Sequence, residues 1–140
     1  MSRRRSALAG SAAALVWAAL EPIDMRLFRT DYSDVAMLGK LVTRRRAWPL
    51  AGLAIHTANG AAFGVLFDEV RRRSGSRPQP LAVCLALAEN AVLFPFGLAL
   101  DRWHPARGEP GVASMVNARG LAQATARHVL FGLALGRWAR

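Results

Sequence analysis

Residues 47–67 read AWPLAGLAIHTANGAAFGVLF, and this stretch decides the fold class. It is about 21 residues long, almost wholly apolar, and free of formally charged side chains. A helix of that length rises ~30 Å, which is the thickness of the hydrocarbon core of a bilayer. We therefore predict that this segment spans a membrane.

A polar ring and small residues interrupt the middle of this predicted span. His56 lies near its centre and is followed by Asn59 and by Gly60-x-x-x-Gly64. An ionisable side chain is costly in lipid, and glycines spaced by four let two helices approach closely. We therefore expect the helix to pack inside a bundle rather than to act as a lone anchor.

Three further segments, at residues 7–28, 81–100 and 120–138, are also predicted to span the membrane. Residues 34–42 have the pattern of a short helix lying on the membrane surface. The predicted fold is an all-α integral membrane four-helix bundle forming a single domain over residues 1–140. Two tandem helical hairpins are one arrangement that fits this order.

The first predicted span leaves one alternative open. Its apolar run, residues 7–20, has the length of a signal-peptide core and follows the basic residues Arg3–Arg5. Extending the helix through Pro22 to Phe28 gives about 22 residues but encloses Glu21. We expect the helix to be retained, with a cleaved signal as the alternative.

The net charge of +10 comes from arginines that cluster between the apolar segments, at Arg3–Arg5, Arg44–Arg46 and Arg71–Arg73. Such clusters are typical of segments next to anionic lipid headgroups. No basic helix interleaved with aromatic residues is present, so the sequence does not favour nucleic-acid binding. The expected partner is the lipid bilayer.

Ionisable side chains recur at a similar depth in three predicted spans. His56, Glu89 and His128 each lie eight or nine residues into their segment, so they should share one layer near the bilayer midplane. Polar groups are rare and costly at that depth. The predicted intramembrane polar network comprises Glu21, His56, Asn59, Glu89, Asn90, Arg127 and His128.

Three interpretations of this layer remain open. It could fix the helix register, with Glu89 pairing with Arg127 or a histidine and with asparagines bonding between helices. It could handle protons or a small solute, with Glu89 titrating. It could also bind a metal ion through His56, Glu89 and His128, the only cofactor that the sequence suggests. No nucleophile has a neighbouring base, so we assign no catalytic residue and favour a non-enzymatic protein.

Two predicted spans share one spacing of small residues after their histidine. Residues four apart lie on one side of a helix, so each histidine would stand at the head of a groove made by small residues. The predicted helix-packing residues are Gly60, Gly64, Gly132 and Gly136. An outer face could also support a homodimer or a membrane partner subunit.

Several short motifs resemble those of small four-span membrane proteins of high-GC bacteria. They are Glu21-Pro-x-Asp24, Asp31-Tyr-x-Asp-Val35, Leu38-Gly-Lys40, His56-x-x-Asn-Gly60-Ala-x-Phe-Gly64 and Ala88-Glu-Asn90. This resemblance covers most of the chain. It implies a multi-pass protein of the bacterial inner membrane and implies no activity, catalytic residue or cofactor.

The expected function is that of an integral membrane protein whose polar layer stabilises the bundle and could conduct protons or a small solute. The alternatives are a membrane-embedded metal-binding protein or enzyme, and an accessory subunit of a membrane complex.

Overall fold

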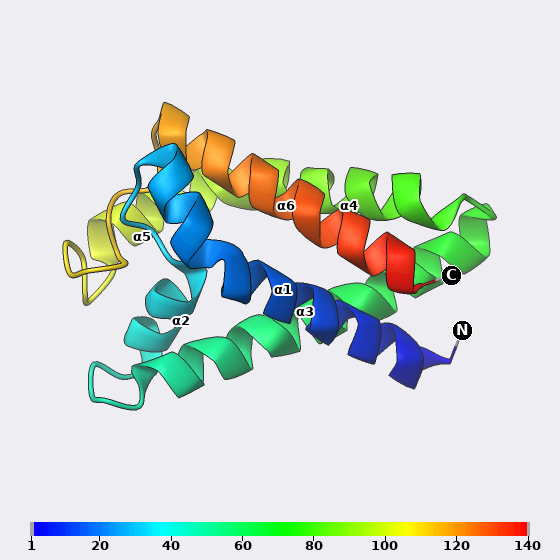
Figure 1. Cartoon of the computed structure of the whole chain (residues 1–140), viewed down its shortest axis with the longest axis horizontal. Coiled ribbons are helices and arrows are strands. Elements are labelled where there is room, and N and C mark those ends of the chain that lie inside the picture. Colours follow the sequence, from blue (N-terminus) through cyan, green and yellow to red (C-terminus); the bar gives the residue numbers. More distant parts are fainter. Residues whose placement is uncertain (1, 140) are drawn as a thin grey trace.

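The computed structural model describes residues 2–139, and within this range the chain is all-α, as predicted (Figure 1). The only β feature among these residues is an isolated antiparallel bridge between Tyr32 and Val112. The helices in chain order are α1 (Arg3–Phe28), α2 (Asp34–Val42), α3 (Trp48–Ser74), α4 (Pro78–Leu93), the 3-10 turn η1 (Phe94–Phe96), α5 (Gly97–Trp103) and α6 (Ala118–Trp138).

The long helices form two antiparallel pairs that meet along one seam. Helix α1 crosses α3, α4 packs along α6, and contact between α1 and α6 joins the pairs (Figure 1). Helix α2 packs against the first half of α3. Helices α3 and α4 contact each other little, although one short turn connects them. The two pairs therefore diverge from that turn.

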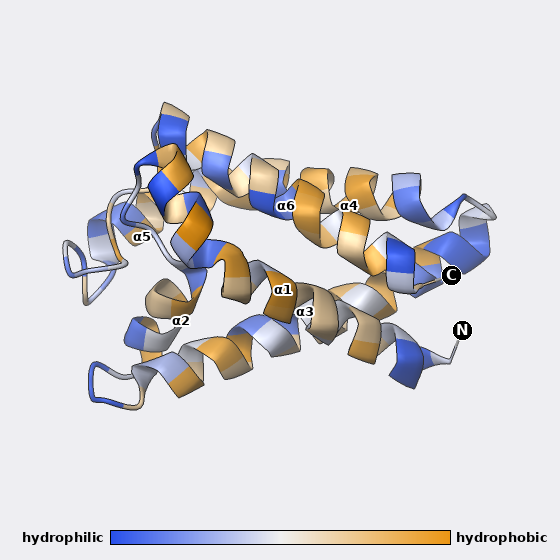
Figure 2. Ribbon diagram, in the orientation of Figure 1, coloured by the Kyte–Doolittle hydropathy of each residue, from blue (hydrophilic) through white to orange (hydrophobic). Residues whose placement is uncertain are grey.

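Three helical segments in the described part of the chain are long and apolar enough to cross a membrane. They are α1, α3 and the continuous stretch Pro78–Trp103, which comprises α4, η1 and α5. Figure 2 shows apolar residues along the middle of these helices and hydrophilic residues at both ends of the molecule.

The fourth predicted span, 120–138, is not among these segments, so the structure supports three spans where the sequence predicted four. Helix α6 does form over Ala118–Trp138 and packs against α4 and α1. Its mean hydropathy is low because it contains Gln123, Arg127 and His128.

Proline sets the shape of the third long segment. Helix α4 ends at Leu93, and Pro95 lies in the 3-10 turn that connects it to α5. A proline has no N–H to donate and its ring crowds the preceding turn, so it kinks or breaks a regular helix, and at Pro95 the α-helix gives way to a 3-10 turn. The span predicted at 81–100 is therefore built from three helical pieces.

Helices α1 and α3 touch backbone to backbone where they cross. A side chain at Gly10 would collide with the carbonyl oxygen of Gly60, and one at Gly64 with that of Ser6. A Cβ at Gly60 would lie 2.6 Å from the Cβ of Ala14. Only small residues allow this approach, which brings the middle of α3 against α1.

Helices α4 and α6 make the same kind of contact. A Cβ at Gly132 would lie 2.7 Å from the Cα of Val83, and one at Gly136 would lie 2.6 Å from the Cα of Gln79. The four glycines singled out in the sequence thus all lie at helix crossings, two in each pair.

We expect Gly60→Leu to destabilise the protein strongly, because the new side chain would force α1 away from α3. Overpacking costs typically 1–3 kcal/mol, and a leucine against backbone should cost at least about that much. Thermal unfolding in detergent would measure it. The matched control is Ala58→Leu, which places the same side chain at an exposed position of α3. Equal melting temperatures for the two variants would contradict the tight crossing.

Candidate functional site

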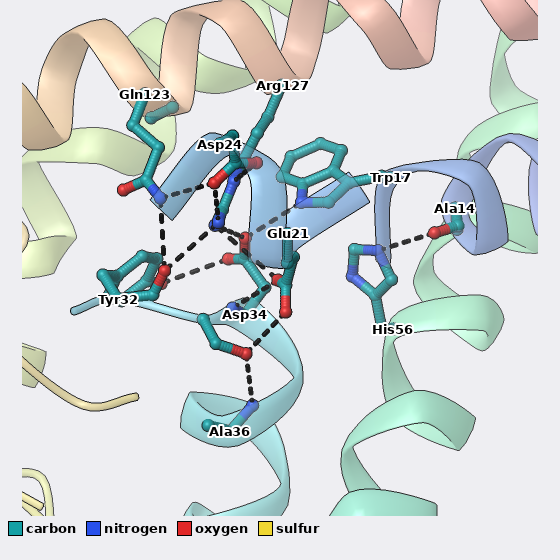
Figure 3. Close-up of polar contacts among 12 residues, drawn as sticks. Ala14, Trp17, Glu21, Asp24, Tyr32, Asp34, Ala36, His56, Gln123 and Arg127 are labelled. Atoms are coloured by element: carbon teal, nitrogen blue, oxygen red, sulfur yellow. Dashed lines mark hydrogen bonds and ion pairs between the residues drawn. The ribbon is translucent and has the colours of Figure 1, made fainter. Parts of the chain in front are cut away.

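Arg127 is the only arginine of α6 whose side chain is buried in the described structure, where it is 2% exposed. It projects from the middle of α6 toward α1 and α2 (Figure 3). An arginine remains charged in a protein, and a buried charge is tolerated only when it is paired and hydrogen-bonded. The groups around it therefore decide whether α6 can pack where it does.

Three carboxylates from two helices surround the guanidinium of Arg127. Asp24 of α1 binds it in a bidentate manner, with 2.7 Å from Nε to Oδ2 and 2.6 Å from Nη2 to Oδ1. Asp34, the first residue of α2, accepts from Nη1 at 2.6 Å. Glu21 of α1 lies 3.6 Å from the same nitrogen. These contacts, with a bond from Nη2 to the Tyr32 carbonyl at 3.1 Å, fasten α6 to α1 and α2.

Neutral donors satisfy the remaining carboxylate oxygens. Asp34 accepts from the Trp17 indole and the Tyr32 hydroxyl, each at 3.1 Å. Gln123, one turn before Arg127, donates to Asp24 at 2.7 Å. Burial and the adjacent Asp34 raise the pKa of Tyr32 above its usual value, so this hydroxyl stays a donor. Each carboxylate is thus held by more than its ion pair.

Glu21 connects this network to the start of α2. It accepts from the Ser33 hydroxyl at 2.5 Å and from the Asp34 backbone N–H at 2.7 Å. Ser33 is also the N-cap of α2, since its oxygen accepts from the Ala36 N–H at 3.0 Å. A carboxylate at a helix N-terminus is favourable because free N–H groups and the helix dipole face it. Glu21 therefore fixes where α2 begins.

The two histidine rings both contact Trp17. Its ring is 5.3 Å from that of His56 and 4.8 Å from that of His128, both edge to face. His56 Nε2 is 3.1 Å from the Ala14 carbonyl, and His128 Nδ1 is 2.7 Å from the Ala124 carbonyl. A carbonyl can only accept, so these nitrogens carry the protons. When the rings are neutral, His56 Nδ1 and His128 Nε2 keep a lone pair.

Glu89 faces His128 across a short gap. Its carboxylate Oε2 lies 3.9 Å from His128 Nε2, and its side chain is 38% exposed. No lysine or arginine among residues 2–139 pairs with it. The sequence left open a partnership of Glu89 with Arg127 or with a histidine, and the structure places it beside the histidine. Arg127 is instead enclosed by the network on α1 and α2.

The two asparagines of the predicted layer have different surroundings. Asn90 is buried and donates to the Thr125 hydroxyl at 3.2 Å, which links α4 to α6. Asn59 is exposed on α3. Only Asn90 therefore acts between helices in this structure.

A cavity of about 300 Å³ lies between the two helix pairs. Its lining includes Trp17, His56 and His128, together with Asn59 from α3 and Glu89 from α4. Asp34 and Arg127 border it on the side of the network, and most of the remaining lining is apolar. The predicted polar layer therefore faces a space within the bundle and not a solid core.

The hypothesis of a metal site gains no support from this geometry. Within residues 2–139, no three His, Cys, Asp or Glu side chains gather closely enough to hold a metal ion. His56 and His128 each contact Trp17, and Glu89 lies beside His128.

Comparison of the chain with protein-family models, with curated proteins and with solved structures finds no match. The function must be argued from the site itself.

Sequence reasoning missed the acidic partners of Arg127. The predicted polar network includes neither Asp24 nor Asp34. One signal could have found Asp24: it lies three residues after Glu21, so both face the same side of α1. No comparable signal points to Asp34, because it reaches the site only through the fold of residues 29–33.

We expect Arg127→Met to destabilise the protein by about 3–5 kcal/mol, because it would leave one buried and two largely buried carboxylates without their cation. The melting temperature in detergent would report the loss. Arg119→Met is the matched control, since Arg119 lies exposed in the first turn of the same helix. A similar effect of both substitutions would show that the network contributes little.

Proposed function

We propose that this chain is a multi-pass protein of the bacterial inner membrane whose central cavity handles protons or a small solute. In this proposal the Arg127 network stabilises the bundle, and Glu89 with His128 forms the functional pair. The observation that carries it is the Glu89 carboxylate, which has no lysine or arginine partner among residues 2–139 and lies 3.9 Å from a histidine lone pair in the lining of a cavity inside the bundle.

The exterior of the helices supports the membrane location. Large apolar side chains are exposed on α1, α3, α4 and α6, among them Leu15, Leu50, Val92 and Leu133. A soluble monomer rarely exposes so much apolar surface, whereas lipid covers it without cost. Helix α6 would then be the fourth span, because its one buried arginine is neutralised by α1 and α2.

The chemistry of the pair supports a role in proton handling. Neutral His128 offers Nε2 as an acceptor 3.9 Å from Glu89, so a small shift of either side chain would let a proton pass between them. Carboxylates and histidines in a membrane interior commonly mark proton or solute pathways. The network around Arg127 is less suited to this task, because each of its carboxylates is already bound by fixed donors.

We expect Glu89→Gln to abolish proton flux in proteoliposomes that contain a pH-sensitive dye and are driven by a potassium diffusion potential. The amide keeps the size of the side chain but cannot bind and release a proton. Flux through the variant should fall to that of protein-free vesicles, while its melting temperature stays near that of the wild type.

The control for this experiment is Glu69→Gln, which removes a partly exposed carboxylate near the end of α3 that pairs with Arg72 and Arg73 and lies outside the cavity lining. It should conduct like the wild type. A well-folded Glu89→Gln variant with unchanged flux, or a wild-type protein with none, would refute the proton pathway.

A further inference from the structure

The lining of the central cavity also indicates which solute would bind there. We propose that the cavity binds a small amphipathic organic cation, an ammonium group carried on an aromatic or apolar body, which enters between α3 and α4. This inference rests on the proposed function, since it names the solute class of the same cavity.

The position of the cavity mouth follows from the exposed part of its lining. Asn59 on α3 is exposed, as are Leu93 at the end of α4 and Phe96 in η1. Helices α3 and α4 contact each other little, whereas α1 and α6 close the opposite side. The opening therefore faces sideways, toward lipid in a membrane, and a molecule dissolved in the bilayer could enter it.

The size of the cavity suits a small molecule and not a helix or a lipid. At about 300 Å³ it lies at the lower end of typical ligand pockets. One aromatic ring with a compact head group fills such a space.

The charges of the lining favour a cation. Its acidic and basic side chains are Asp34, His56, Glu89, Arg127 and His128, and Tyr32 is present as a neutral phenol. The positive charge of Arg127 is already neutralised by three carboxylates, so the lining offers no unpaired positive charge to attract an anion. The carboxylate of Glu89, by contrast, has no cationic partner in the described residues.

The neutral part of the lining favours the same class. The His56 and His128 bonds to carbonyl oxygens leave lone pairs and no spare N–H on the neutral rings, so these rings can accept from an ammonium N–H. Aromatic faces attract cations, and this attraction is stronger where water is scarce. The cavity is lined by six aromatic side chains: Trp17, Tyr32, Phe63, Phe94, Phe96 and Phe131.

The test uses two probes that share a benzyl group and differ in the charge of a tetrahedral head: benzylammonium, which also carries N–H donors, and phenylmethanesulfonate. Binding to purified protein in nanodiscs would be measured by isothermal titration calorimetry, with empty nanodiscs as the blank. We expect the cation to bind and the sulfonate not to bind. Equal binding of both probes, or no binding of the cation, would overturn the proposal.

Variants connect the binding to the named residues. Glu89→Gln should weaken cation binding by about tenfold or more, whereas Glu89→Asp, which keeps the charge, should retain most of it. Phe96→Leu at the mouth should weaken binding by about two- to fivefold. Glu69→Gln should bind like the wild type. Unchanged affinity in a folded Glu89→Gln protein would overturn the assignment.

The outcome separates this inference from the proposed proton pathway. Cation binding that depends on Glu89, in a protein without proton flux, would uphold the binding site and refute the pathway. Proton flux that depends on Glu89, without cation binding, would refute the binding site alone.

Discussion

The burial of one guanidinium is the constraint on which this structure depends. Helix α6 can pack against α1 only if Arg127 is neutralised there, and Asp24 and Asp34 do so at 2.6–2.7 Å. Removing one partner of a buried ion pair is far more costly than the pair itself is worth. The network therefore restricts how the helices assemble: α6 can pack only where α1 and the start of α2 together present their carboxylates to Arg127.

That condition determines the geometry of the cavity as well. Trp17 donates to Asp34, and this bond orients the indole that the rings of His56 and His128 contact edge to face. The side chains that hold the helices together thus set the positions of those that face the open space. Glu89 is the exception, because it lies on α4 and has no part in the network. An ionisable group left outside the stabilising contacts is the natural candidate for a function.

The sequence was informative wherever structure follows from one helix at a time. Apolar length predicted helices long enough to cross a membrane, and the spacing of Gly60 and Gly64 pointed to a face that packs closely. Sequence analysis failed where a side chain in one predicted span pairs with a side chain from a segment outside the spans. Arg127 was expected to find a partner at equal depth in another span, yet Asp34 belongs to a short helix outside the predicted spans. Depth along a span carries no information about a segment that folds back onto the bundle.

Helix α2 shows why that folding back matters. Its Gly39 lies so close to α3 that a side chain there would collide with the Trp48 backbone, and Gly52 is equally close to Val35. Its first turn meanwhile receives Glu21 from α1. One nine-residue helix thus joins the end of α1 to the beginning of α3 and presents Asp34 to α6. Because α2 and the Arg127 network hold α1, α3 and α6 together on one side, α4 is left to form the opposite wall of the cavity, and Glu89 lies on that wall.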